Sequence, residues 1–434
     1  MHRHSRSALL TAVLLALGLV ISASPVAAHD PDDFENPDPK AEFLLQNLED
    51  LEPASEVALS DMPCESGAAG PFPCKKVDLQ SFLPLGSIAG GSGNDIWGWT
   101  DPKSKREYAL MGTSNGTSFV DVTKAKKPVF LGHMPTQSAV GFPLWRDIKV
   151  RNNHAFVVSE HSAHGLQVFD LKRLRDVPMP PTVFTPDATY SNFSNAHNIN
   201  INEKTGFAYA VGTNTCEGGL HMVNIRKPNN PRFAGCFADD GYTHDVQCVV
   251  YKGPHRKFRG NEICFASNED TVTIVDVSDK DNPRMLSRTP YGSAAYTHQG
   301  WLTPDQRHFL FGDELDEQGN TVPKTTTFIM DTKKLTNPST PKAFSHKTEA
   351  IDHNLYVHGD QVFASNYTAG LRILDYDDRS LSRGELNEIA FFDVVPGSDI
   401  DEFAGTWSNY RFPRSQNVVV STIESGLFVL KPRV

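Results

Sequence analysis

Four histidines recur at intervals of about fifty residues in the second half of the chain, and another polar residue follows each of them. The pairs are His197-Asn198, His244-Asp245, His298-Gln299 and His353-Asn354. Imidazole nitrogens bind transition metals, and they exchange protons near neutral pH. If the fold brings the four side chains together, they predict a metal-binding or proton-transfer site.

Acidic residues recur in step with the histidines. Glu160, Glu269 and Glu314 each follow an apolar run that comes after a polar pair of the same kind. Carboxylate oxygens beside imidazoles suit a divalent metal that activates water. The candidate metal ligands are therefore His197, His244, His298, His353, Glu160, Glu269 and Glu314. A divalent metal is the cofactor that this pattern indicates, although the sequence makes no cofactor certain.

These residues belong to a repeated unit that must position them. From about Pro71 to Val434 the unit occurs seven times, each with a polar pair, an apolar run that ends in a polar turn, and an alternating run closed by Asp or Asn. Four short strands in about fifty residues are typical of a β-propeller blade. The sequence predicts an all-β, seven-bladed β-propeller over residues 64–434. The last unit stops after its third strand, and we expect Phe82–Ile88 to complete it and close the ring.

Inner strands of a propeller line the central channel, so equivalent positions form rings around it. The candidate binding ring at the channel mouth consists of Asp95, Arg146, Asp147, His197, His244, Asp245, His298 and His353. Because side chains alternate along a strand, only one of two adjacent positions is expected to face the channel. The sequence leaves open whether that is the histidine position or the position after it.

A structural alternative exists for the same residues. A residue repeated in every blade can serve the repeat itself, by bonding to the backbone of the neighbouring blade. The tryptophans near the inner-strand starts have two interpretations as well, as core residues or as a sugar-binding platform; they are Trp97, Trp99, Trp145, Trp301 and Trp407. No Gly-x-Ser-x-Gly, P-loop or His-Glu-x-x-His motif occurs, so no catalytic residue is assigned.

The N-terminus predicts export. Residues 1–28 have a basic start, an apolar core and small residues before Ala28, which is typical of a signal peptide. Residues 29–63 form a predicted acidic, mostly disordered tether, because residues 29–61 carry eleven Asp and Glu against one Lys. No later stretch is long and apolar enough to span a membrane. We expect a secreted, extracellular or periplasmic protein, with the tether as a candidate contact to the cell surface.

Charge and cysteines narrow the class of protein further. The formal net charge of −11 comes mostly from the tether, and no broad basic surface is indicated, so nucleic-acid binding is excluded. Six cysteines in an exported chain predict disulfides. The repeat favours neighbours in sequence, which gives the pairs Cys64 with Cys74, Cys216 with Cys236 and Cys248 with Cys264.

The third runs of the repeat also resemble a known family. Val272–Val277 and Leu371–Asp375 resemble the LVIVD repeat, and the longer pattern through Asp95–Trp99, Tyr242–Asp245 and Thr297–Thr303 is similar to the bacterial choice-of-anchor B family. The resemblance covers roughly Cys64 to Val434, and it implies an exported, often surface-displayed propeller. Only Lys431–Val434 follows Leu430, without a sorting motif, so we expect a freely secreted or periplasmic form.

Three function hypotheses follow. The first is a non-enzymatic binding or display module that engages an extracellular protein or glycan. The second is a metal-dependent hydrolase or lyase that uses the His and Glu/Asp residues at the channel mouth, and the third is a structural spacer. Propellers host all of these roles, so the fold alone cannot decide. The oligomeric state is not indicated by the sequence.

Overall fold

The computed structural model describes residues 47, 51–137, 145–319 and 321–434, and most of these residues lie in or between β-strands. The predicted signal peptide and most of the predicted tether lie outside the described residues. The blade sheet begins earlier than the predicted domain boundary at residue 64, because Leu59–Met62 forms strand β1. Within the described part of the chain, no helix is long and apolar enough to cross a membrane.

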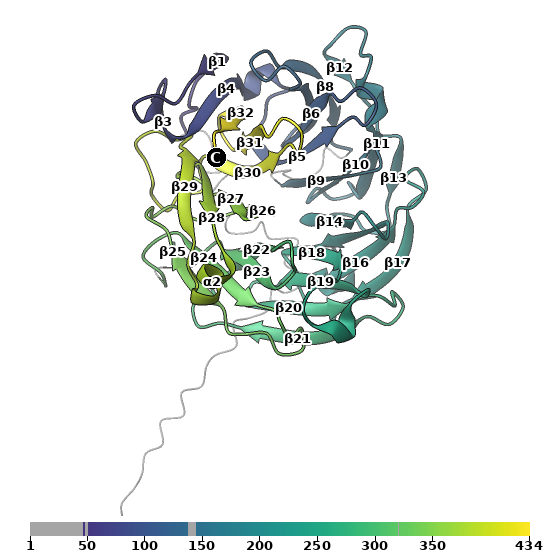
Figure 1. Ribbon diagram of the computed structural model, residues 1–434. Helices are drawn as coiled ribbons and strands as arrows, with labels where there is room; N and C mark the ends of the chain where they lie inside the picture. The colour runs from purple at the N-terminus through teal and green to yellow at the C-terminus, as the bar shows by residue number, and fades with distance from the viewer. Residues whose placement is uncertain (1–46, 48–50, 138–144, 320) are drawn as a thin grey trace, which may run out of the picture.

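Seven sheets surround a central channel, so the predicted seven-bladed β-propeller is confirmed (Figure 1). Blade one contains β5 (Gly93–Thr100), β6 (Glu107–Thr113), β7 (Gly116–Asp121) and β8 (Val129–Pro135), with β12 (Thr182–Val183) at its edge. Blade two contains β9 (Arg146–Arg151), β10 (His154–Ser159), β11 (Leu166–Asp170) and β13 (Ala188–Tyr190). Blade three contains β14 (Asn198–Asn202), β15 (Phe207–Val211), β16 (Leu220–Asn224) and β17 (Arg232–Phe237).

The remaining blades follow the same order from the channel outward. Blade four contains β18 (Asp245–Val250), β19 (Glu262–Ser267), β20 (Thr271–Asp276) and β21 (Arg284–Pro290). Blade five contains β22 (Thr297–Leu302), β23 (His308–Asp313), β24 (Thr326–Asp331) and β25 (Lys342–Ser345). Blade six contains β26 (Leu355–His358), β27 (Gln361–Ser365), β28 (Leu371–Asp375) and β29 (Asn387–Phe392), extended by β3 (Phe72–Lys75) and β2 (Ala68–Ala69).

Blade seven closes the ring with strands from both ends of the chain. It contains β30 (Thr406–Arg411), β31 (Val418–Thr422), β32 (Gly426–Pro432), β4 (Val77–Pro84) and β1. The predicted closure by an N-terminal strand is confirmed, because β4 pairs antiparallel with β32. The predicted bounds Phe82–Ile88 were wrong: alternating burial begins at Val77, and the strand ends where Leu85–Ser87 form a 3-10 turn.

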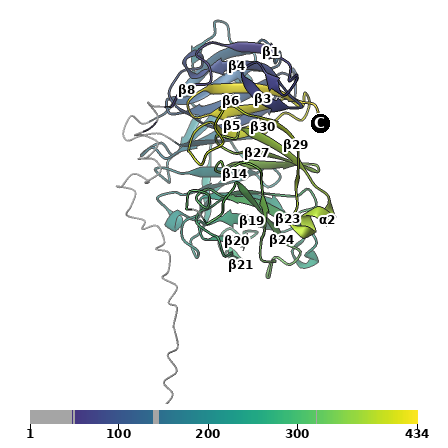
Figure 2. The ribbon, with the colours of Figure 1, turned by 90° about the vertical axis from the view of Figure 1, so that its left-hand side faces the viewer.

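Helical structure is short in the described chain. The helix α2 (Asp378–Arg383) begins with a capping box at Asp377 and ends at Gly384 in the left-handed region. Three further 3-10 turns span Leu171–Leu174, Cys216–Gly218 and Arg256–Phe258. Figure 2 shows α2 and the C-terminus on one face of the disc. Helix α2 and the C-terminus each follow the third strand of a blade, and third strands run in the same direction as inner strands. The histidines lie at the starts of inner strands, so they belong to the opposite face.

The hydrophobic core lies between blades rather than in one centre. Seven apolar clusters each join two neighbouring blades; blades six and seven, for example, share Phe363, Ile373, Val420 and Phe428. Phe428 of β32 packs with its ring centroid 4.5 Å from that of Phe82. The closing strands are therefore held by side-chain packing as well as by backbone pairing.

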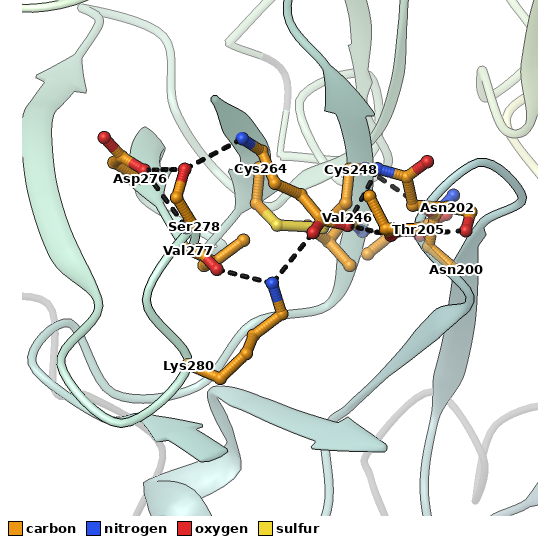
Figure 3. Close-up of a disulfide and its surroundings, with 12 residues drawn as sticks. Asn200, Asn202, Thr205, Val246, Cys248, Cys264, Asp276, Val277, Ser278 and Lys280 are labelled. Carbon is orange, nitrogen blue, oxygen red and sulfur yellow. Dashed lines mark hydrogen bonds and ion pairs between the residues drawn. A yellow bond between two sulfur atoms is a disulfide. The ribbon is translucent and has the colours of Figure 1, made fainter. Parts of the chain in front are cut away.

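All three predicted disulfides are confirmed. Cys64 pairs with Cys74, Cys216 with Cys236, and Cys248 with Cys264. Figure 3 shows the third bond joining the facing strands β18 and β19. Beside it, the Cys248 N–H donates to Asn200 Oδ1 of blade three over 3.0 Å. The disulfide thus reinforces a strand pair that also contacts the neighbouring blade.

We expect Phe428→Ala to weaken closure of the ring. Phe428 is fully buried, and deletion of a buried aromatic side chain costs about 3–5 kcal/mol. Thermal unfolding and protease resistance measure the effect. Phe233→Ala is the matched control, because Phe233 is 52% exposed. Equal losses in the two variants would contradict the role given to Phe428.

Candidate functional site

The four repeated histidines meet at one end of the channel. Successive ring centroids lie 4.1 Å apart for His197 and His244, 4.1 Å for His244 and His298, and 4.3 Å for His298 and His353. Four consecutive blades supply them, so the contacts run around the channel rather than along one strand. We call these four residues the histidine arc.

Two tryptophans extend the arc across the channel mouth. Trp407 lies 4.5 Å from His353 between ring centroids, and it stacks on Trp145 at 4.6 Å. Tyr367, Phe403, Ile351 and Ile423 pack with the two indoles in one apolar cluster. Leu51 packs against this cluster, and the Ala54 N–H donates to Ser425 Oγ over 2.9 Å. The described end of the predicted tether is therefore docked at this mouth.

Two of the three predicted carboxylates join the arc. Glu160 Oε1 lies 2.5 Å from His197 Nδ1. Glu314 lies between two histidines, with Oε2 3.6 Å from His298 Nε2 and Oε1 3.7 Å from His353 Nε2. The Tyr367 hydroxyl donates to Glu314 Oε1 over 2.6 Å, which fixes the carboxylate in place.

One subset of the arc has the spacing of a metal centre. His244, His298 and Glu314 each offer one ligand atom, and these atoms lie within 4.8 Å of one another. His244 Nδ1 lies 3.0 Å from the carbonyl oxygen of His298. When that nitrogen donates to the carbonyl, the Nε2 lone pair is available for a metal, as is usual for metal-ligating histidines.

The arc also fits the structural alternative, in which a repeated residue bonds to the backbone of the neighbouring blade. His244 Nδ1 contacts the His298 carbonyl in the next blade, and His353 Nδ1 contacts the Trp407 carbonyl in the same way. Each of these contacts joins two blades, so both rings are oriented before any ligand binds. The structural and metal-binding roles use different nitrogens, and they are compatible.

Two other predicted site residues do not join the arc. The Arg146 side chain lies between blades, where Nε donates to the Thr113 carbonyl over 3.2 Å and Nη1 lies 3.0 Å from His164 Nε2. The indole of Trp145, one residue earlier, lies at the channel mouth instead of the Arg146 side chain. Glu269 bridges blades four and five through its backbone, which pairs with Thr297. In the described residues Glu269 is not part of a group with metal-ligand spacing.

The predicted acids Asp95 and Asp147 lie deeper in the channel. Asp95 Oδ2 accepts from the Ile148 N–H over 3.1 Å, and Asp147 Oδ2 accepts from the Ile199 N–H over 2.7 Å. Lys149 pairs with both acids, and its Nζ lies 3.5 Å from Asp95 Oδ2. Burial raises the pKa of Asp95 well above its usual value. Burial acts on Asp147 in the same direction, but the Lys149 ammonium and the hydrogen bonds to the Asp147 carboxylate together outweigh it and lower the pKa of Asp147.

Asp245 belongs to the same deeper layer. Burial, and then the negative charge of Asp147, raises the pKa of Asp245 to about 7. Tyr356 of blade six interacts with Lys149 of blade two, and its hydroxyl lies 3.3 Å from Ser408 Oγ of blade seven. Side chains from blades on opposite sides of the ring therefore meet at the axis.

The expectation that only one of the two rings faces the channel was wrong. His197 and His244 immediately precede β14 and β18, so strand alternation does not apply to them. His298 lies within β22, where the register shifts between Thr297 and Gly300. Both sets therefore reach the axis at different depths, the histidines at the mouth and the acids below.

The interior beyond these layers is filled mainly by aromatic side chains. Trp97 and Trp301 pack against Tyr356, with ring centroids 5.6 and 5.1 Å away, and Lys149 Nζ lies 4.7 Å from the Trp97 centroid. Trp301 also lines a pocket of about 310 Å³ at the other end of the channel, beside Asn200, Gln247 and Gln306. Core packing describes Trp97, while Trp301 also lines this pocket.

Sequence reasoning missed Tyr367, which contacts both Glu314 and the His353 ring. A signal for it was present. Tyr367 lies two residues after β27 as Glu269 lies two residues after β19, and both pair through the backbone with the next inner strand, so the two positions of the repeat are equivalent. Its aromatic side chain hid the equivalence, because the pattern was read for carboxylates alone.

Comparisons with known proteins give the fold and no more. No protein family and no curated protein sequence matches this chain. The β-propeller domain of Cps50 (Swd1) from Myceliophteria thermophila is similar in structure, with a TM-score of 0.50 and 10% identity over 80% of this chain and 98% of that one. A functionally unknown protein from Desulfotomaculum acetoxidans has a TM-score of 0.48 at 11% identity, covering 72% and 88%. The designed protein Ika8 has a TM-score of 0.47 at 8% identity, covering 78% and 82%.

We expect Lys149→Met to destabilise the protein strongly. The change leaves Asp95 and Asp147 buried without their cation, and the loss of one partner from a buried charge pair costs about 3–5 kcal/mol. Chemical denaturation of the two proteins measures the difference. Lys172→Met is the control, because Lys172 pairs with Asp170 on the surface, where such pairs contribute about 0–1 kcal/mol. A loss for Lys149→Met no larger than that of the control would refute the buried pairing.

Proposed function

We propose that this protein is an exported β-propeller that binds an extracellular protein or glycan through a divalent transition metal at the histidine arc. The observation that carries the proposal is the convergence of His244, His298 and Glu314, whose ligand atoms lie within 4.8 Å of one another. Two imidazoles and a carboxylate are a known ligand set of zinc sites that keep a further position open. A carboxylate or hydroxyl of the partner would take that position.

Export rests on three independent supports. Three disulfides suit an oxidising compartment. Residues 1–28 have the composition of a signal peptide. The resemblance to the choice-of-anchor B family adds an expectation of surface display or secretion, and we propose membership of that family on the motifs given above.

Access to the centre is best at blades two and three. The side chains of His197 and Glu160 are 12% and 29% exposed, whereas that of Glu314 is 6% exposed. The His197 ring lies 4.1 Å from that of His244, so a partner at the exposed pair is next to the proposed centre. We place the partner's coordinating group at this side of the mouth.

Metal content tests this proposal directly. Protein purified from an oxidising compartment without chelator is expected to carry about one equivalent of a transition metal by elemental analysis. His298→Ala and Glu314→Gln should each lower that content at least tenfold with the fold intact. His154→Ala is the control, because His154 lies at the start of β10 and contacts the Asn152 carbonyl, away from the arc. If the wild type carries no metal and His298→Ala only lowers thermal stability, the histidines are structural.

Partner binding then tests the second half of the proposal. Wild-type protein and Glu314→Gln are screened on the same array of glycans and secreted proteins, with and without chelator. A partner bound by the metal-loaded wild type alone supports recognition through the metal. Binding that is unchanged by both chelation and Glu314→Gln removes the arc from the binding site.

A metal-dependent hydrolase or lyase is the second candidate function, and one further contact favours it. Glu160 Oε1 lies 2.5 Å from His197 Nδ1, which is the geometry of an imidazole oriented by a carboxylate. Such a pair can take a proton from water beside the proposed centre. The pair is also partly exposed, as a group that meets substrate must be.

Glu160→Gln separates the two candidate functions. In a hydrolase, metal-loaded protein should cleave model carboxylic or phosphate esters, and Glu160→Gln should lower kcat about 100-fold with little change in metal content. Glu349→Gln serves as the control, because Glu349 is an exposed acid. Absence of turnover by the metal-loaded wild type over a broad ester panel would leave the binding function alone.

A further inference from the structure

Three buried carboxylates meet beside the histidine arc, and none of them belongs to it. Asp316 and Glu317 lie in the loop after β23, and Asp352 lies just before β26. Each offers one oxygen to a group whose atoms lie within 4.8 Å of one another. The exposed fractions are 0%, 4% and 2%, so all three side chains are almost fully removed from water.

Within the described residues, four oxygens of this group accept no hydrogen bond of normal geometry. They are Asp316 Oδ1, Asp316 Oδ2, Glu317 Oε2 and Asp352 Oδ2. The other two oxygens accept from the backbone: Glu317 Oε1 from the Thr326 N–H over 2.8 Å, and Asp352 Oδ1 from the Asp313 N–H over 3.3 Å. The backbone thus fixes two of the carboxylates and leaves an acceptor oxygen on each.

The surrounding chain is shaped around these oxygens. A Cβ atom at Gly312 would lie 1.6 Å from Asp352 Oδ2, so only glycine leaves room for this carboxylate. The neighbouring Asp313 is different, because it accepts from the Tyr291 hydroxyl over 2.6 Å and from the Tyr296 N–H over 2.6 Å. Asp313 has these donors, whereas four oxygens of the three-carboxylate group have none among the described residues.

Carboxylates buried this way need a cation or a proton. Burial raises the pKa of Asp316 to about 7 and that of Glu317 to about 12, with repulsion between the acids adding to the effect. No lysine or arginine of the described chain pairs with them. A shared proton neutralises one charge, whereas a divalent cation can take one oxygen from each of the three carboxylates.

We propose that Asp316, Glu317 and Asp352 bind calcium and tie the loop after β23 to the start of β26. Calcium takes six to eight oxygen ligands at flexible angles, and an all-carboxylate group in an irregular loop suits it better than the strict octahedron of magnesium. Extracellular calcium sites need only weak affinity, with dissociation constants of about 10⁻⁴–10⁻³ M.

The calcium site would stabilise the geometry of the histidine arc without using any residue of the arc as a ligand. Glu314 lies two residues before Asp316, and His353 directly follows Asp352. Fixing the two segments against each other holds Glu314 at its distance of 3.7 Å from His353. Calcium therefore supports the geometry of the mouth, and its binding does not depend on whether the arc binds a transition metal.

Calcium titration of the full-length, chelator-treated protein tests the proposal. We expect 10 mM CaCl₂ to raise Tm by roughly 2–3 °C, as linkage requires of a cation that binds only the folded state with this affinity. MgCl₂ at the same concentration should give less than half of that shift. Terbium is the second probe, since it substitutes for calcium, and its luminescence should rise on binding and fall when calcium is added.

Variants test which residues are responsible for the calcium-dependent rise in Tm. Asp316→Asn and Asp352→Asn keep the side-chain shape. Each should raise the calcium concentration that gives half of the maximal Tm shift at least tenfold. Glu349→Gln, an exposed acid, should leave it unchanged. His298→Ala should also leave it unchanged, which separates this site from the transition-metal centre.

Two results would overturn the proposal. One is a Tm that does not respond to calcium, together with terbium luminescence that calcium does not displace. The other is a calcium response that survives in both Asp316→Asn and Asp352→Asn. If in the first case Asp316→Asn also raises Tm, the group is held by a shared proton rather than by a cation.

Discussion

The fold depends on polar side chains of the inner strands that bond to the backbone of the next blade. Neighbouring inner strands do not pair with each other as a sheet, so their facing N–H groups need other acceptors. Asn200 Oδ1 accepts from Cys248 N, Gln247 Oε1 from Leu302 N, and Gln299 Oε1 from Leu355 N, all within 3.0 Å. Asp95 and Asp147 do the same in blades one and two. These polar side chains thus join blades one to six in succession, and together with the apolar clusters between blades they turn separate sheets into one ring.

This constraint explains why a chemical site forms at the strand starts. Each blade must bring its polar acceptors to set heights, so the residue at or near the start of the first strand also arrives at the same height in every blade. In blades three to six that residue is histidine, and in blade seven the indole of Trp407 follows. The arc forms because the blades are aligned at the same height. Its chemistry depends on the side chains that the loops after the second strands contribute.

The sequence was sufficient for the repeat, the blade number, the closure and the disulfides, because each depends on local patterns of strands and turns. It also placed His197, His244, His298 and His353 at equivalent positions of the repeat, but it left open whether they or the residues after them face the channel. It failed where geometry departs from the repeat. Arg146 occupies the aligned position, yet its guanidinium lies 3.0 Å from His164 between blades, and only the placement of blade two decides that. The fifth-blade carboxylates escaped notice because Asp316 and Glu317 lie in a loop without an equivalent in the other units.

Two buried acidic groups of this propeller are neutralised in different ways. In the deeper channel layer Asp95 and Asp147 share Lys149, a cation that the chain supplies itself. At the mouth between blades five and six, Asp316, Glu317 and Asp352 have no such partner in the described chain, although they are equally buried. Lys149 can pair with Asp95 of the neighbouring inner strand because several blades meet at the channel axis. Within the described chain no lysine or arginine pairs with the loop carboxylates after β23, so a cation or a proton from solution has to compensate their charge.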